Sequence, residues 1–280
     1  MNSGVIYVAT GDGFFREAVK SAETLREEID VNITIFTDKE REAPKDFFSI
    51  SVLDNPVFGF EDKINAMQES PYDRTLYLDT DIYVTSDIIE LFDMLDVFEL
   101  AVAHDVARCE SLANDSEPGR TVEGVPRSFP EHNTGVIIYR SDDKMDELLN
   151  NWKEDYREGD PHDQPAFRRA LYNSNIRFAT LPPEYNYFAP SPGFAHGRVR
   201  VLHHRILDID TPGGDMKLDV KEFTSNINES TEKRVSYRLG NKVKYIVPSQ
   251  KPTLSYRLKR SIQNDGIAKT LQKGLSKLIS

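Results

Sequence analysis

Residues 75–84 read TLYLDTDIYV, and the rest of the chain can be interpreted outward from this segment. Its apolar, β-branched and aromatic residues are typical of a buried strand. The strand ends abruptly at Asp79 and Asp81, whose side chains would share one face of an extended chain. Two neighbouring carboxylates resist ionising together unless a cation lies between them. Because oxygen ligands suit hard divalent ions, we predict that Asp79 and Asp81 bind Mg²⁺ or Mn²⁺, which in turn binds phosphates.

A structural interpretation of the same segment is also open, because the Asp-x-Asp pattern is short and common. An acidic turn could simply close the strand, with Asp87 beginning a helix at residues 88–95. The flanking sequence favours function. YLDTDI at residues 77–82, followed by SDIIELF at residues 86–92, resembles the Asp-x-Asp block of nucleotide-sugar glycosyltransferases with the GT-A fold. The resemblance is to the family-8 type, which includes glycogenin and bacterial lipopolysaccharide galactosyltransferases.

The N-terminal region has the pattern of a strand, a helix and a second strand. Apolar runs at residues 5–10 and 31–36 flank a segment, residues 14–29, with apolar side chains at helical spacing. This order predicts a βαβ unit and therefore a parallel sheet with a right-handed crossover. The glycines between strand and helix form neither a dinucleotide fingerprint nor a Walker A motif, so they indicate either a tight turn or a loop that approaches a nucleotide. The resemblance implies that Thr10 and Asp38, which follow the two strands, hold the base and ribose.

Further site residues are implied by the resemblance. Lys63, on an expected helix at residues 60–67, would lie near the nucleotide, although a solvated helix lysine is equally open. Asn133, which opens the strand HNTGVIIYR at residues 132–140, would face the donor sugar. Asp163 and Gln164 would contact sugar hydroxyls beside the anomeric centre. From the residues alone, Asp163 could instead be the N-cap of a helix that reaches about residue 172.

A pair of histidines ends the apolar strand VRVLHHR at residues 199–205. A lone histidine is more often structural than a ligand. The resemblance implies that His203 completes the metal site. The Lys-Pro-Trp sequence that usually follows in the family is absent, since Trp152 is the only tryptophan, and this leaves the phosphate contact of the loop unassigned.

Composition limits the classes of function. The net charge of −11 argues against nucleic-acid binding. No run approaches the roughly 18 apolar residues of a spanning helix, no signal peptide is visible, and Cys109 is alone, so we expect a cytoplasmic protein. A polar stretch at residues 105–131, rich in Gly, Pro and Ser, indicates a lid or an acceptor-facing loop.

The C-terminal region differs from the rest of the chain. Two alternating runs around Gly240-Asn241 predict a β-hairpin. Residues 251–280 carry seven basic side chains against one acidic, a net charge of +6, so the other 250 residues carry −17. If residues 267–279 are helical, apolar and basic side chains fall on opposite faces. This pattern indicates either docking on an anionic membrane surface or a terminal helix that packs on its own domain.

We therefore expect an α/β protein with a GT-A domain at residues 1–207, a mostly parallel central sheet, a β-hairpin appendage at 208–250 and a basic helical tail at 251–280. The expected function is metal-dependent transfer of a hexose from a nucleoside-diphosphate sugar to a hydroxyl acceptor, such as a glycan or a lipid-linked saccharide. A histidine ligand favours Mn²⁺ over Mg²⁺. Retention of configuration is implied by the resemblance alone, because no residue identifies itself as a nucleophile or general base.

Two other classes stay open. One is a non-catalytic protein that binds nucleotide sugars or serves as a membrane-docked scaffold. The other is a phosphatase of the haloacid dehalogenase type, which also places Asp-x-Asp after a strand, normally the first one and with Thr or Val two residues after the second Asp. Here Tyr83 holds that position.

Overall fold

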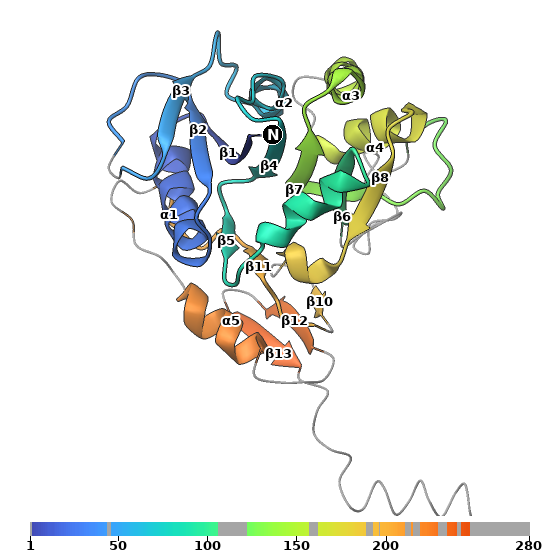
Figure 1. Ribbon diagram of the computed structural model, residues 1–280. Coiled ribbons are helices and arrows are strands. Elements are labelled where there is room, and N and C mark those ends of the chain that lie inside the picture. Colours follow the sequence, from blue (N-terminus) through green and yellow to red (C-terminus); the bar gives the residue numbers. More distant parts are fainter. Residues whose placement is uncertain are drawn as a thin grey trace, which may run out of the picture.

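A mostly parallel seven-stranded sheet forms the centre of the molecule (Figure 1). The computed structural model describes residues 2–43, 46–105, 122–156, 162–188, 193–195, 197–210, 214, 219–228, 234–239 and 242–246. The strand order is β3-β2-β1-β4-β7-β6-β8, with bounds Ser49–Val52, Asn32–Thr37, Ser3–Ala9, Arg74–Leu78, His132–Arg140, Leu100–His104 and Phe178–Leu181. Only β7 runs antiparallel to its neighbours in this sheet. The expected α/β class and the parallel β1–α1–β2 unit are confirmed.

Helices cover both faces of the sheet, because alternate side chains of each strand are apolar on both sides. On one face, α1 (Asp12–Glu28) and the 3₁₀-helix η1 (Ile89–Asp96) pack against Val5, Tyr7 and Leu76. On the other, α2 (Phe60–Gln68), α3 (Asp143–Asp155) and α4 (Gln164–Asn173) pack against the alternate residues, such as Ile6 and Tyr77. The helix expected at residues 88–95 is thus the 3₁₀-helix, and Asp87 Oδ1 accepts a hydrogen bond from the Ile89 N–H.

Strand β4 ends before the two aspartates, whereas the sequence predicted an extended chain through Asp81. The main-sheet pairing of β4 ends at Leu78, and the Ile82 N–H donates to the carbonyl oxygen of Asp79 at 3.2 Å. The chain then enters a second sheet of order β5-β11-β9, with bounds Ile82–Val84, Val201–His203 and Tyr187–Phe188. Asp79 and Asp81 therefore lie in a turn between two sheets rather than on one strand face, because Ile82–Val84 pair with β11 instead of the central sheet.

The C-terminal part adds the 3₁₀-helix η2 (Pro183–Tyr185), α5 (Val220–Asn228) and a third sheet of order β10-β12-β13, with bounds Gly193–Ala195, Arg234–Leu239 and Lys242–Ile246. Leu239 pairs with Lys242, so the predicted hairpin around Gly240-Asn241 is confirmed. Cys109, most of the polar loop and the basic tail lie outside the described residues. The domain boundaries stay predictions.

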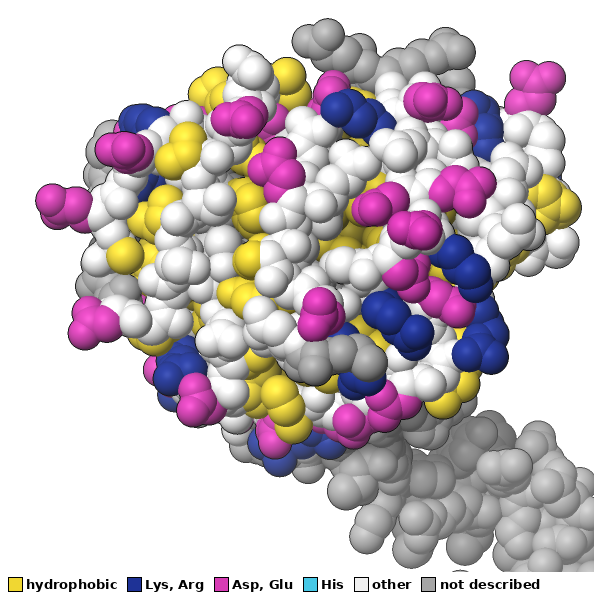
Figure 2. Space-filling model, turned by 45° about the horizontal axis from the view of Figure 1, so that its top comes forward, with side chains coloured by type: hydrophobic (Ala, Val, Ile, Leu, Met, Phe, Trp, Pro, Cys, Tyr) yellow, Lys and Arg dark blue, Asp and Glu magenta, His cyan; other side chains and the backbone are white. Residues whose placement is uncertain are grey.

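The surface mixes charges of both signs. On the face shown in Figure 2, acidic side chains are scattered widely, with lysines and arginines between them. Among the helices that the structure describes, none has the length and apolar character needed to cross a membrane.

Candidate active site

Three residues from the junction of two sheets bring their ligand atoms together. Asp79 follows β4, Asp81 precedes β5 and His203 ends β11. Because β11 pairs with β5 so that His203 lies opposite Ile82, the histidine is placed beside Asp81. Its Nε2 lies 3.4 Å from Asp81 Oδ1, and ligand atoms of all three residues lie within 4.8 Å of one another.

Gly135, on β7, makes room for this cluster. The Asp79 N–H donates to the Gly135 carbonyl oxygen at 2.8 Å, so β7 runs directly behind the aspartate. A Cβ on Gly135 would lie 2.6 Å from His203 Cε1 and 3.0 Å from Asp79 Oδ2. Only a glycine lets the strand approach this closely.

The His203 ring is held by a chain of buried amides. Its Nδ1 lies 2.9 Å from Asn186 Oδ1, and Asn186 Nδ2 donates to Asn133 Oδ1 at 2.8 Å. Asn133 Oδ1 also accepts from the Gly135 N–H. With its Oδ1 turned to His203, Asn186 favours a proton on Nδ1, so Nε2, which faces the carboxylates, is the nitrogen that a metal would bind. Burial lowers the pKa of His203, but the charge and hydrogen bond of Asp81 outweigh it and raise the pKa above its ordinary value.

Lys63 is buried rather than solvated. Its Nζ lies 2.9 Å from Asp163 Oδ2, 3.4 Å from Asp79 Oδ1 and 3.1 Å from Thr134 Oγ1. Burial lowers the pKa of Lys63, but the charges of Asp163 and Asp79 more than compensate, so the pKa lies above its ordinary value and the side chain stays a cation. The interpretation as a surface lysine is therefore wrong.

Asp163 stands at the N-terminus of α4 without capping it through its side chain. Its carboxylate instead accepts hydrogen bonds from Lys63 and Thr134, while its carbonyl oxygen accepts from Trp152 Nε1. Capping therefore does not explain this residue. Removing one member of such a buried ion pair would leave an uncompensated charge.

A second buried network lies beneath the turn and was missed in the sequence. Glu17, on α1, is fully buried and accepts a hydrogen bond from Thr80 Oγ1 at 2.6 Å and one from Arg205 Nε at 3.3 Å. Burial raises the pKa of Glu17 to about 7, against the lowering effect of Arg205. The available signal was a glutamate on the buried face of α1, beside Ala18, since fully buried carboxylates are rare unless paired.

A cavity of about 300 Å³ opens onto the aspartates. Thr10, Lys63, Asp79, Asp81 and His203 line it, and its further lining residues are Val8, Phe14, Phe58, Gly59, Phe60, Tyr77, Thr80 and Arg205. Five of the predicted site residues thus share one cavity.

The other four predicted residues do not line this cavity. Asp38 lies beside the first turn, where its Oδ1 accepts from the Gly11 N–H and from Arg41, each at 2.8 Å. Asn133 and Asp163 belong to the buried networks around the aspartates, and Gln164 begins α4.

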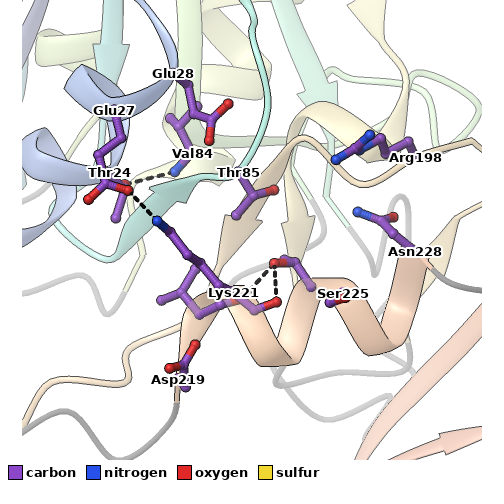
Figure 3. Close-up of a pocket in the computed structure, with 12 residues that line it drawn as sticks. Thr24, Glu27, Glu28, Val84, Thr85, Arg198, Asp219, Lys221, Ser225 and Asn228 are labelled. Carbon is purple, nitrogen blue, oxygen red and sulfur yellow. Dashed lines mark hydrogen bonds and ion pairs between the residues drawn. The ribbon is translucent and has the colours of Figure 1, made fainter.

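A larger cavity of about 870 Å³ lies elsewhere, between α1, the end of β5 and α5 (Figure 3). Its polar side chains join these elements to each other: Lys221 is paired with Glu27 at 2.7 Å, and Thr24 Oγ1 accepts from the Val84 N–H. It shares no lining residue with the smaller cavity. We therefore locate the candidate active site at the aspartates, by chemistry rather than by size.

A family model covers the part of the chain that contains the candidate site. Residues 74–209, which contain Asp79, Asp81 and His203, match the family model of nucleotide-diphospho-sugar transferases. The fold is similar to that of the galactosyltransferase LgtC in complex with donor and acceptor sugar analogues (TM-score 0.54, 14% identity, 80% of this chain and 94% of that chain). A structure of an LgtC active-site mutant with glutamate in place of a glutamine matches equally (TM-score 0.53, 14% identity, 80% and 94%). A comparison with curated proteins found no match.

Residues 74–209, just under half of the chain, match the nucleotide-diphospho-sugar transferase family, and the whole fold is similar to the GT-A fold of LgtC. Together the two findings support a GT-A nucleotide-sugar glycosyltransferase that resembles family 8. The phosphatase alternative finds no support, because Asp79 follows β4 in the middle of the sheet rather than the first strand.

Proposed function

We propose that this chain transfers a hexose from a nucleoside-diphosphate sugar to a hydroxyl of a glycan or lipid-linked saccharide, and that it requires a divalent metal. One observation carries the proposal: two carboxylates and a histidine, whose Nε2 lies 3.4 Å from Asp81 Oδ1, have ligand atoms within 4.8 Å of one another and line one cavity. This donor set fits a divalent cation, and the nitrogen ligand favours Mn²⁺ over Mg²⁺. When bound, the cation would neutralise charge that develops on the departing diphosphate.

The remaining residues would bind and orient the donor. Thr10 lines the cavity next to the first turn, where Asp38 fixes the backbone of Gly11, so these residues would hold the nucleoside. Lys63 ties Asp79 to Asp163, which would keep both carboxylates in position as the sugar binds. The contacts of Asp163 and Gln164 with the sugar, at the start of α4 and outside the cavity lining, rest on the resemblance alone. Asn133 would act through Asn186 on His203. Retention of configuration remains part of the proposal on resemblance alone. A cytoplasmic location remains part of it on the sequence expectations alone.

The experiment is a screen of UDP-, GDP- and TDP-sugars with Mn²⁺ for release of nucleoside diphosphate. We expect turnover with one donor, lost in excess EDTA and lowered at least about a hundredfold by Asp81→Asn, since even residues behind the ligands of a metal typically contribute tenfold to a hundredfold. The matched control is Asp93→Asn, an exposed aspartate of η1, which should behave as the unmodified protein. Full activity in excess EDTA would contradict the metal requirement. The absence of turnover with every donor would contradict the proposed function.

A further inference from the structure

This inference rests on the proposed function and concerns the cations of the donor cavity. Among the residues that line the cavity, as the structure describes it, one is a lysine and one an arginine: Lys63 and Arg205. The Lys63 side chain is only 6% exposed, and its ammonium is paired with the buried carboxylate of Asp163. The Arg205 side chain is 45% exposed, so its charge is the one that an anion in the cavity can reach.

The guanidinium of Arg205 is held in a defined orientation. Glu17 accepts a hydrogen bond from Nε at 3.3 Å, and the guanidinium carbon lies 5.2 Å from the centre of the Phe14 ring. Nη2 lies 3.7 Å from Asp81 Oδ2, beyond hydrogen-bond distance. The guanidinium therefore reaches from a buried carboxylate to the edge of the candidate metal site, and the residue lines the cavity.

Glu17 ties this orientation to the turn itself. Its carboxylate is fully buried and bridges Arg205 to Thr80, the middle residue of the Asp-x-Asp turn. The Arg205 guanidinium and the Asp-x-Asp turn are thus connected through Glu17 on α1. A substitution of Glu17 should therefore change the position of Arg205 and of the turn.

Charge balance gives Arg205 its role. A divalent cation bound by Asp79 and Asp81 is neutralised by these two ligands, whereas a nucleoside diphosphate brings further negative charge. A guanidinium presents a planar fork of donors that matches phosphate oxygens. We propose that Arg205 binds the diphosphate of the donor, and that Glu17 is the positioning residue that aims it.

The test separates the diphosphate from the nucleoside. Binding of UDP, GDP, TDP, uridine and inorganic pyrophosphate is measured by calorimetry with saturating Mn²⁺ for the full chain and four variants: Arg205→Ala, Arg205→Lys, Glu17→Gln and Arg198→Ala. We expect Arg205→Ala to weaken the binding of nucleoside diphosphate and of pyrophosphate by about tenfold to a hundredfold, the size of effect typical of hydrogen bonds to charged groups. Uridine binding should not change, and Arg205→Lys should restore part of the loss. Arg198, an exposed arginine outside the cavity, is the control and should have no effect.

Glu17→Gln should weaken diphosphate binding less than Arg205→Ala and spare uridine, with an unchanged melting temperature. Equal binding of diphosphate by the unmodified protein and Arg205→Ala would overturn the inference, and so would an equal loss for uridine and diphosphate, which would mean a structural role. If the unmodified protein binds none of the diphosphates, the proposed function fails instead.

Discussion

Gly135 is the residue at which the candidate site tolerates no side chain. Gly135→Ala would push a methyl group against His203 Cε1 at 2.6 Å, so strand β7 or the histidine must move. Overpacking of this kind typically lowers the free energy of unfolding by about 1–3 kcal/mol. We expect that loss in urea unfolding, together with weaker Mn²⁺ binding in a metal titration.

The matched control for this variant is Gly197→Ala, where the added Cβ would lie 3.4 Å from Glu184 Oε1 and outside the site. A Gly135→Ala protein that binds Mn²⁺ as tightly as the unmodified chain would show that the ligands do not occupy these positions.

His132 makes stability depend on pH. It is fully buried, its ring lies against those of His104 and Phe178, and no hydrogen bond reaches either of its nitrogens. Burial, with the charges of His104 and Arg168, lowers its pKa to about 4. In the unfolded chain this histidine has a pKa near 6.5, so between about pH 6.5 and pH 4 it is protonated in the unfolded chain but not in the folded protein. The free energy of unfolding should therefore be unaffected by His132 above pH 6.5 and should fall as the pH drops toward 4, by up to about 3 kcal/mol from this residue.

Urea unfolding at pH 7.5, 6 and 5 tests this dependence. His132→Phe, which cannot be protonated, should lose less stability on acidification than the unmodified protein. His162→Ala, at an exposed position, should follow the unmodified protein. Parallel curves for His132→Phe and the unmodified chain would contradict the assignment.

At the scale of elements, local sequence patterns were sufficient for most strands and helices. Apolar runs predicted β1 and β2, helical periodicity predicted α1, and alternation around a turn dipeptide predicted the β12–β13 hairpin. They could not predict that residues 75–84 divide between two sheets, because that depends on pairing with β11, far along the chain.

The same limit applies to the site. The paired carboxylates at the end of the strand indicated Asp79 and Asp81, and the resemblance added His203; the structure brings all three together. Neither argument predicted Glu17 or the role of Asn186. Glu17 bonds Thr80, 63 residues away, and Asn186 bonds Asn133, 53 residues away, so no local sequence pattern indicates either contact. Contacts of that separation follow from the fold, not from neighbouring residues.

The loop before α2 is held in place by one buried carboxylate. Phe58 has φ of 58°, a left-handed conformation that costs a non-glycine residue about 1–2 kcal/mol. The buried carboxylate of Asp62 holds it by accepting hydrogen bonds from the backbone N–H groups of Val57 and Phe58, each at 2.8 Å. Asp62→Ala should therefore lower the free energy of unfolding by about 2–3 kcal/mol, since hydrogen bonds to charged groups contribute most.

Denaturant unfolding checks this value, with Asp93→Ala as an exposed control expected within about 0.5 kcal/mol of the unmodified protein. A loss for Asp62→Ala no larger than the control's would mean that the loop is held by other contacts.

At the scale of the whole molecule, charge is unevenly distributed along the chain. The first 250 residues carry −17 and the last 30 carry +6. We propose that this tail, outside the described residues, docks on an anionic membrane surface, where each basic residue contributes on the order of 1 kcal/mol. The full chain should sediment with anionic vesicles at low salt and be released at high salt.

A chain that ends at Pro248 should stay in the supernatant and keep its nucleotide-sugar binding. If both chains behave alike, the tail packs on its own domain and the membrane proposal is lost.

The most direct measurement is a Mn²⁺ titration in the presence of nucleoside diphosphate, followed by electron paramagnetic resonance. We expect the unmodified protein and His204→Ala to bind Mn²⁺ with similar affinity, because the half-buried His204 is not part of the cluster. His203→Ala should bind at least about tenfold more weakly, because it removes the nitrogen ligand that Asn186 orients. Equal affinity of His203→Ala and His204→Ala would contradict the metal site.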